Sequence, residues 1–304
     1  MHIEYTRPPL TPYQTAILDD PARFTVTEAS TKTGKTASHI IWLFEQALKC
    51  KENQSVWWIA PIFTQSRIAY SRMKAQINRR DFLHTNDSAM LIRLPTGAFI
   101  RFKSADKPDS LYGDDVYAAV FDEFTRAKEE AWFALRSALT ATKGRCKLIG
   151  NVKGKNNWGY RLGQKAKMKE PGYSYHKITA YQAAECGIIE WSEIEQAKKD
   201  LPENVFRELY LAEPSDDLTN PFGLANIERC LKPIQQGPVV AYGVDLAKYT
   251  DWTVIIGLNK QNEVCHFERF QSDWAMTNTK YILSSYSMLP TKNRIISVSR
   301  LVAS

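Results

Sequence analysis

Residues 27–38 have the sequence TEASTKTGKTAS. Its GKT core at 34–36 ends like the motif G-x-x-x-x-G-K-[ST], a P-loop, in which backbone N–H groups surround phosphate and a lysine reaches its oxygens. Ala29 stands where the motif has its first glycine. Alanine is compatible with that position if its φ is negative, since only a positive φ favours glycine. The alternative interpretation is an ordinary helix start capped by Thr33 or Ser30.

The segments around this loop alternate between strand and helix patterns. FTVTEA (24–29) predicts a strand before the loop, and apolar residues at helical spacing predict a helix over 36–50. Buried strands are also predicted at 55–61, 116–124 and 145–151, with a hairpin over 89–105. Strands that alternate with helices favour a parallel α/β sheet, whose ligands bind at the carboxyl ends of the strands. Three polar groups lie at such ends: Ser30–Thr36, Asp122-Glu123 and Asn151.

Asp122 and Glu123 follow the apolar run VYAAVF (116–121), a pattern typical of a Walker B strand. Asp122 would hold Mg²⁺ through water, and Glu123 would orient and deprotonate an attacking water. Adjacent acids also favour a helix N-terminus, and the helical pattern KEEAWFALRSAL (128–139) follows, so both explanations can hold together. Two motifs in this order predict that the chain binds ATP.

The composition is that of a globular chain with a modest basic excess. At 304 residues it is long enough for two domains, and 44 % apolar with 24 % charged residues excludes a disordered chain. The net charge of +7 hints at a polyanionic partner. Five scattered cysteines without a C-x-x-C motif argue against structural zinc and disulfides and fit a reducing cytosol. We expect neither a signal peptide nor a membrane span.

The character of the chain changes after about residue 215. PSDDLTNPFG (214–223) is rich in turn-forming residues and predicts a linker. Beyond it we predict strands at 239–247, 252–258, 263–270 and 294–299, with a helix at 274–289 before the last strand. We therefore expect a first domain over 1–215 with a small linker subdomain at about 180–215, a linker over 216–236 and a second domain over 237–304.

Together these segments resemble the large terminase subunit of tailed bacteriophages, the DNA-packaging motor. PYQTAIL (12–18) is similar to the family's adenine-reading Gln motif, and EASTKTGKT (28–36) to a variant P-loop with an internal lysine. VWWIAPIFTQSR (56–67) and IRFKSADKPDSLYG (100–113) resemble the segments after the P-loop helix and before Walker B. KLIGNVKGKNNWGYRL (147–162) resembles the coupling motif. The resemblance covers nearly the whole chain.

The resemblance implies an ASCE-type P-loop ATPase domain with a parallel sheet, followed by a partial ribonuclease H-like α/β domain. It implies that Asn151 senses the γ-phosphate and acts in hydrolysis with Glu123 and Asp122. Mg²⁺ would be held by Thr36 and Asp122. The residues implied to bind ATP are Gln14, Ser30, Thr31, Lys32, Thr33, Gly34, Lys35 and Thr36.

The resemblance also implies partners and one departure from the family. The expected partners are double-stranded DNA, the procapsid portal, a small terminase subunit and further copies in a ring, all in the cytoplasm of the bacterial host. Many relatives have an arginine followed by glycine before Walker B, where this chain has Leu111-Tyr112-Gly113. Candidates for an arginine finger that acts on a neighbour's ATP are Arg101, Arg126 and Lys32.

Residues 143–169 form a basic run with nine lysines and arginines and no acid. Basic side chains neutralise DNA phosphates without reading sequence, as a translocating motor requires. Because this run follows Asn151, we expect it to link the ATP state to DNA grip. The alternative is a solvated helix face. The predicted DNA contacts are Lys153, Lys155, Trp158 and Arg161.

Asp245 and Asp251 are the candidate metal ligands of the second domain. Asp245 is expected in mid-strand, where an inward carboxylate is costly unless it binds metal or is paired. The pair resembles the opening of the terminase nuclease, which uses Mg²⁺ or Mn²⁺. The alternative for Asp245 is an edge-strand acid that caps a turn.

The further acids of that nuclease pattern are missing. Ser297 or Ser299 stands where the family has a fourth-strand Asp, and the tail 291–304 is basic. We therefore expect an incomplete, marginally folded domain without useful nuclease activity, from a natural short chain, a frameshift or an artefact.

Two other functions fit the same motifs. One is a helicase-like, DNA-stimulated ATPase with an unrelated second domain. The other is a non-catalytic remnant that binds DNA or partners. Glu123→Gln separates the enzymes from the remnant, since it should trap ATP and abolish hydrolysis in a live site. Portal binding separates terminase from helicase.

Overall fold

The computed structural model describes residues 5–76, 83–214, 227, 229–245, 252–271 and 296–299. The chain divides into two compact units, Met1–Leu224 and Ala225–Ser304. Among the described residues, no helix combines the length and apolarity needed to cross a bilayer.

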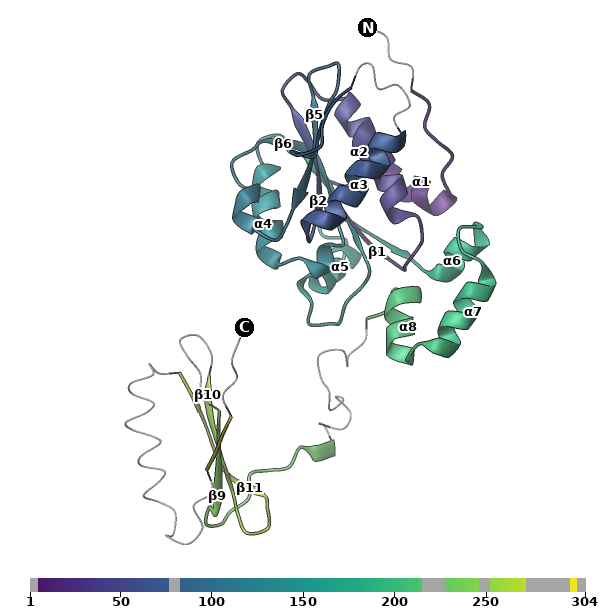
Figure 1. The fold of residues 1–304 in the computed structure, drawn as a ribbon. Helices are drawn as coiled ribbons and strands as arrows, with labels where there is room; N and C mark the ends of the chain where they lie inside the picture. The colour runs from purple at the N-terminus through teal and green to yellow at the C-terminus, as the bar shows by residue number, and fades with distance from the viewer. Residues whose placement is uncertain are drawn as a thin grey trace. The chain divides into compact units, whose positions relative to one another are not determined.

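The first unit is built on an eight-stranded sheet in the order β3-β4-β5-β2-β6-β7-β1-β8 (Figure 1). The strands from β5 through β8 in this order are parallel, and β3 and β4 add an antiparallel edge. The sheet is therefore mixed but mainly parallel. Its strands are β1 Phe24–Ala29, β2 Ser55–Ala60, β3 His84–Asn86, β4 Leu91–Arg93, β5 Phe99–Ser104, β6 Val116–Asp122, β7 Arg145–Gly150 and β8 Tyr173–Ile178.

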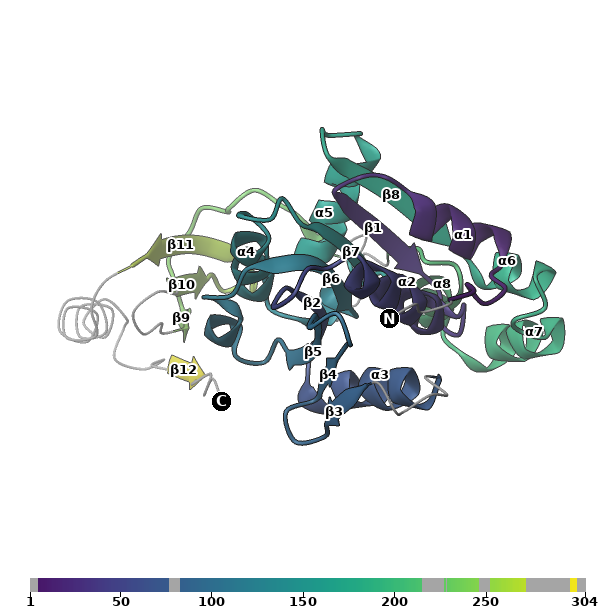
Figure 2. The same ribbon diagram turned by 90° about the horizontal axis from the view of Figure 1, so that it is seen from above.

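Helices cover both faces of this sheet. Figures 1 and 2 show α1, α2 and α3 on one face and α4 and α5 on the other. The helices are α1 Pro12–Asp19, α2 Lys35–Leu48, α3 Phe63–Gln76, α4 Glu129–Ala138, α5 Trp158–Lys167, α6 Ala180–Glu185, α7 Trp191–Asp200 and α8 Glu203–Tyr210, with short 3-10 turns at Pro108–Leu111 and Phe124–Arg126.

The alternation of side chains along the central strands makes two cores. On β2, Val56 and Trp58 pack with α2 and α3, whereas Trp57 and Ile59 pack on the side of α4 and α5. Burial on both faces explains why these strands read as continuous apolar runs. A third cluster, around Ile194 and Phe206, joins α6, α7 and α8.

The structure confirms the strands predicted at 24–29, 55–61, 116–124 and 145–151, the helix after Lys35 and the hairpin over 89–105. β3 and β8 were not predicted. Both are edge strands: β3 is exposed and β8 is mostly half-buried, so neither carries a long apolar run.

The second unit contains a four-stranded sheet in the order β11-β10-β9-β12. β9 pairs antiparallel with β10 and parallel with β12, and β10 pairs antiparallel with β11. The strands are β9 Ala241–Asp245, β10 Thr253–Leu258, β11 Val264–Phe270 and β12 Ile296–Ser299. The helix predicted at 274–289 and most of the linker predicted at 216–236 lie outside the described residues.

Candidate nucleotide-binding site

The sheet order brings the three polar groups of the sequence motifs together at one edge of the sheet, the side where its parallel strands end. β6, β7 and β1 are adjacent and parallel, so their carboxyl ends lie side by side. Asp122 ends β6, Asn151 follows β7, and the loop 30–36 follows β1. Such an edge is the usual ligand site of an open α/β sheet.

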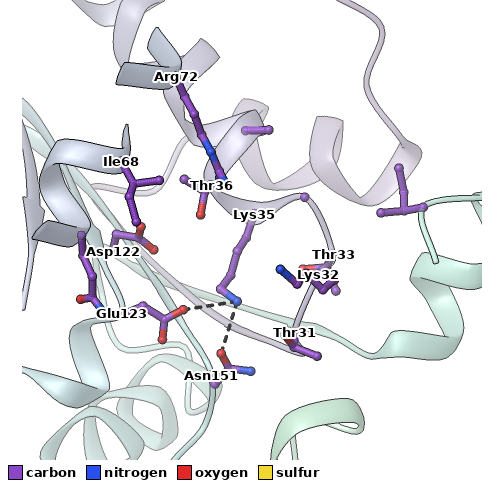
Figure 3. A pocket seen from close by; sticks show the side chains of 14 residues that line it. Thr31, Lys32, Thr33, Lys35, Thr36, Ile68, Arg72, Asp122, Glu123 and Asn151 are labelled. Carbon is purple, nitrogen blue, oxygen red and sulfur yellow. Dashed lines mark hydrogen bonds and ion pairs between the residues drawn. The ribbon is translucent and has the colours of Figure 1, made fainter. Parts of the chain in front are cut away.

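A cavity of about 420 Å³ opens at this edge. Figure 3 shows Lys35 in its middle, with Glu123 and Asn151 beside the ammonium group. The lining residues come from the loop, from α3, from the ends of β6 and β7 and from the turn after α6. They are Thr31, Lys32, Thr33, Gly34, Lys35, Thr36, Ala37, Gln65, Ile68, Arg72, Asp122, Glu123, Asn151 and Ile188.

The backbone of the loop resolves the question of its missing first glycine. Ala29 belongs to β1 and has no positive φ, so this position does not require glycine. Gly34 has φ 74° and Lys32 has φ 57°, both in the left-handed region. A Cβ on Gly34 would lie 2.6 Å from Nε2 of Gln14, the end of a flexible side chain that can shift, so the positive φ is what favours glycine there. The alternative of a helix capped by Ser30 or Thr33 does not describe α2, whose N-cap is Gly34 without a side-chain cap.

Lys35 connects the three strand ends. Its Nζ lies 3.3 Å from Oδ1 of Asn151, 3.4 Å from Oε1 of Glu123 and 3.4 Å from the carbonyl oxygen of Ser30. The lysine is therefore held by groups that surround the cavity. An incoming phosphate would replace these neutral and acidic partners.

Asp122 is buried at the end of β6. Burial, and then the adjacent Glu123 carboxylate, raises the pKa of Asp122 to about 7. Its Oδ1 has no hydrogen-bond partner among the described residues, and neither does Nδ2 of Asn151. Buried polar atoms are normally paired, so these two atoms are available to a ligand in the cavity.

Glu123 adopts φ 48°, which is uncommon for a residue with a side chain. Besides its contact with Lys35, its Oε2 lies 3.6 Å from Nε of Arg126. The carboxylate is thus held between two cations at the cavity wall. A strained backbone at such a position is typical of functional sites.

The donor set fits a hard divalent cation that accompanies phosphate. Mg²⁺ prefers oxygen ligands and is commonly held by one or two carboxylates and substrate phosphates. Asp122 and Thr36 supply a carboxylate and a hydroxyl to the same cavity. A cation would also offset the cost of burying the unpaired Asp122 carboxylate.

Gln14 contacts the loop 30–36 from α1. Its Oε1 accepts a hydrogen bond from the backbone of Thr11 in a capping box, and its Nε2 lies 3.4 Å from the carbonyl oxygen of Thr33. Tyr13 donates a hydrogen bond of 2.8 Å to the same carbonyl. Gln14 is not one of the residues that line the cavity, and its predicted contact with adenine stays a prediction.

Sequence reasoning missed the contribution of α3. Gln65, Ile68 and Arg72 line the cavity and are spaced three and four residues apart on one helix face. This spacing was visible in the sequence, but α3 was not predicted as an element. Ile188, between α6 and α7, carries no chemical signal and was missed for that reason.

The structure corrects one of the predicted DNA contacts, Trp158, and shows a partner within the protein for another, Arg161. Trp158 is 8 % exposed, lies in the core beneath α5 and donates a hydrogen bond of 2.7 Å from Nε1 to the carbonyl of Ala127. It therefore cannot stack on a base. Arg161 is exposed but is paired with Glu129 at 2.9 Å.

Other members of the basic run also have partners within the protein. Lys147 is buried and donates to the carbonyl oxygen of Ile17, and Lys165 pairs with Glu170. Lys153 and Lys155 are exposed in the loop after Asn151.

α8 connects the loop after Asn151 to the loop 30–36. The carbonyl oxygen of Leu209 accepts a hydrogen bond of 2.7 Å from the backbone N–H of Thr31. The side chain of the preceding residue, Glu208, accepts one of 3.0 Å from the backbone N–H of Gly154. One short helix thus holds both segments that flank the cavity.

The second unit does not assemble a metal site from its described residues. Asp245 is the last residue of β9 and is exposed, so the expectation of an inward, mid-strand carboxylate is wrong. Asp251 lies outside the described residues. The described part of the chain holds no group of three or more His, Cys, Asp or Glu side chains suited to a metal ion.

The sheet order and the helices on both faces define the class of fold, a mixed α/β domain with a mainly parallel eight-stranded sheet. Comparison with solved structures specifies the fold further. The ATPase domain of the Thermus phage P74-26 large terminase matches 68 % of this chain and 94 % of its own, with a TM-score of 0.60 and 19 % identity. The chain thus has the fold of a phage large-terminase ATPase domain.

Two longer structures match as well. The HK97 bacteriophage large terminase matches 96 % of this chain and 70 % of its own, with a TM-score of 0.60 and 18 % identity. The large terminase of a thermophilic bacteriophage in complex with ATP-gamma-S matches 96 % and 77 %, with a TM-score of 0.55 and 11 % identity. No protein-family model and no curated protein sequence matches the chain.

Proposed function

We propose that this chain is an ATP-hydrolysing motor that moves double-stranded viral DNA into procapsids. The observation that carries the proposal is the meeting of Lys35, Asp122, Glu123 and Asn151 at the ends of three adjacent parallel strands. The similarity to large terminases supports DNA packaging as the activity. The partners we propose for it are double-stranded DNA, a portal, a small subunit and further copies in a ring.

The proposed hydrolysis uses the side chains in distinct roles. Lys35 leaves Glu123 and binds the β/γ-phosphate oxygens, and the backbone N–H groups of the loop surround the phosphates. Glu123, then held by Arg126 alone, orients the attacking water and accepts its proton. The Nδ2–H group of Asn151, which has no hydrogen-bond partner among the described residues, donates toward the γ-phosphate.

Thr36 and Asp122 would hold Mg²⁺, which when bound neutralises phosphate charge. The pKa of Asp122 is raised by burial and then by the adjacent Glu123, and a bound cation would offset both effects, which supports this assignment. Gln14 is proposed to reach the base from its position under the loop.

The loop after Asn151 is the proposed link between ATP state and DNA. Lys153 and Lys155 are exposed there, and Gly154 between them is tied to α8 through Glu208. A movement of Asn151 would therefore shift two lysines that can contact DNA phosphates. Arg161, beyond the loop, is proposed as a weaker contact because DNA would compete with Glu129.

For the second unit we propose a ribonuclease H-like fold. The order β11-β10-β9-β12, with β12 parallel to β9, supports it. Asp245 would be its first-strand acid and Asp251 its second, with Mg²⁺ or Mn²⁺ as the metal. In the register of the sheet Ser299 lies opposite Asp245, where the fourth-strand acid is expected. We therefore propose weak metal binding and no useful cleavage.

The test is ATP hydrolysis by the purified chain with and without double-stranded DNA, compared with Lys35→Ala. The proposal expects hydrolysis that DNA stimulates and that Lys35→Ala abolishes. Retention of portal by the immobilised chain separates the terminase from a helicase-like ATPase. Hydrolysis that persists in Lys35→Ala would overturn the proposal.

A further inference from the structure

We propose that Arg72 binds the terminal phosphate of the nucleotide within the same chain, from the α3 side of the cavity. The inference rests on the proposed function of the site and adds a residue that the sequence motifs do not contain. It assigns to α3 a direct part in distinguishing a nucleoside triphosphate from a diphosphate.

The packing of α3 against the core determines which of its faces lines the cavity. Ala69, Tyr70 and Met73 are buried in the core that α3 shares with β2 and β5. The neighbouring face carries Gln65, Ile68 and Arg72, and all three line the cavity. Figure 3 shows Arg72 pointing from the helix toward Thr36, with Asn151 on the far side of Lys35.

The charges in the cavity leave Arg72 without a partner of its own. Lys35 and Arg126 both approach Glu123, at 3.4 and 3.6 Å. Arg72 makes no hydrogen bond or ion pair with any other described residue. An arginine that faces a cavity with its guanidinium unengaged can bind an anion without first breaking a contact.

Arg72 acts at the end of the cavity where the metal and the terminal phosphate belong. Arg72 and Asp122 both line the cavity. Asp122 ends β6, which pairs with β2, and β2 leads into α3. Arg72 and Lys35 therefore approach this end from two different elements.

The chemistry of arginine suits this position. A guanidinium presents several N–H donors in one plane and matches two phosphate oxygens at once, which an ammonium group cannot do. The γ-phosphate carries the charge that ADP lacks. Arg72 should therefore strengthen binding of the triphosphate and leave binding of ADP nearly unchanged.

The experiment compares wild type, Arg72→Ala, Arg72→Lys and Arg67→Ala for the affinity of ATP-gamma-S and of ADP, each with Mg²⁺. Arg67 is the matched control because it lies on the same helix but lines a separate groove with Lys74 and Asp87. We expect Arg72→Ala to weaken ATP-gamma-S roughly tenfold and ADP less than twofold, about the loss of one charge-assisted contact. Arg72→Lys should lie between, and Arg67→Ala should match wild type.

An unchanged ratio of the two affinities in Arg72→Ala would overturn the inference, as would an equal effect of Arg67→Ala. These outcomes are separate from failure of the proposed function. A wild-type chain that binds both nucleotides but hydrolyses no ATP would overturn the motor, while the ratio would still decide the role of Arg72. A wild-type chain that binds neither would overturn both.

Discussion

We compare the side of the first unit's sheet where its parallel strands end (the first edge) with the side of the second unit's sheet where β9 ends (the second edge). The two differ in how many elements supply polar groups. At the first edge three adjacent strands and α3 place a lysine, two carboxylates, an amide and an arginine around one cavity. At the second edge, among the described residues, β9 ends in the exposed Asp245, which lies opposite a serine. A site therefore needs convergence of several elements, and a single acid at a strand end does not make one.

Replacing Glu123 should have the largest effect at the first edge. Glu123→Gln keeps the shape but removes the proton acceptor, so we expect hydrolysis to fall roughly a thousandfold while ATP still binds. Steady-state hydrolysis and retention of labelled ATP measure the two effects. Glu130→Gln, an exposed acid on α4, is the control. Equal loss of binding and hydrolysis would contradict the assigned role.

Trp158→Ala should act on the stability of the first unit. Trp158 packs against Phe121 and Phe124 in the core, so its removal should lower the free energy of unfolding by about 3–4 kcal/mol. Chemical denaturation measures the loss, with the half-exposed Trp191 as a control position. If the variant is as stable as wild type but binds DNA more weakly, Trp158 contacts DNA after all.

Asp122→Asn should stabilise the ligand-free protein. Because the pKa of Asp122 is raised to about 7 in the folded state, its deprotonation opposes folding. We expect the variant to gain about 1–2 kcal/mol at pH 8, a discounted part of the shift, and the gain to shrink as pH falls from 7 toward 4. Thermal unfolding in EDTA at pH 8 and pH 5 measures this, with the exposed Asp115→Asn as control. A variant that is less stable at pH 8 would mean that Asp122 already has a counterion.

Charge reversal of Lys153 and Lys155 should weaken DNA binding about tenfold at low salt, and the salt dependence should become shallower by about two counterions. The measurement is a titration of fluorescent duplex DNA at several salt concentrations. Reversal of Lys198 and Lys199, two exposed neighbours on α7, is the control for net charge. Equal effects of the two double variants would leave the loop after Asn151 without a special part in DNA binding.

Asp245→Asn should have the smallest effect. An exposed acid at a strand end contributes little, so we expect a change in stability within about 0.5 kcal/mol. Plasmid cleavage in Mn²⁺ should stay at background in both proteins. Robust cleavage that Asp245→Asn abolishes would show that the second edge is built like the first.

The sequence predicted the strands whose ends meet at the first edge, because the information for them is local. A buried strand, a loop with GKT and a helix are adjacent in the chain, and the second and third motifs end apolar runs that could be read directly. The parts that could not be predicted depend on tertiary packing. Trp158 seemed exposed because it stands among lysines, yet helical spacing turns it into the core beneath α5. Arg72 acts through the orientation of α3, which only the packed core fixes.

The central claim is that the converging groups at the first edge hydrolyse ATP. Its most direct test is the rate of phosphate release by the wild-type chain and by Lys35→Ala, each with and without double-stranded DNA. We predict release by the wild type that DNA increases, and none above background from the variant in either condition. Equal rates in the two proteins would contradict the claim.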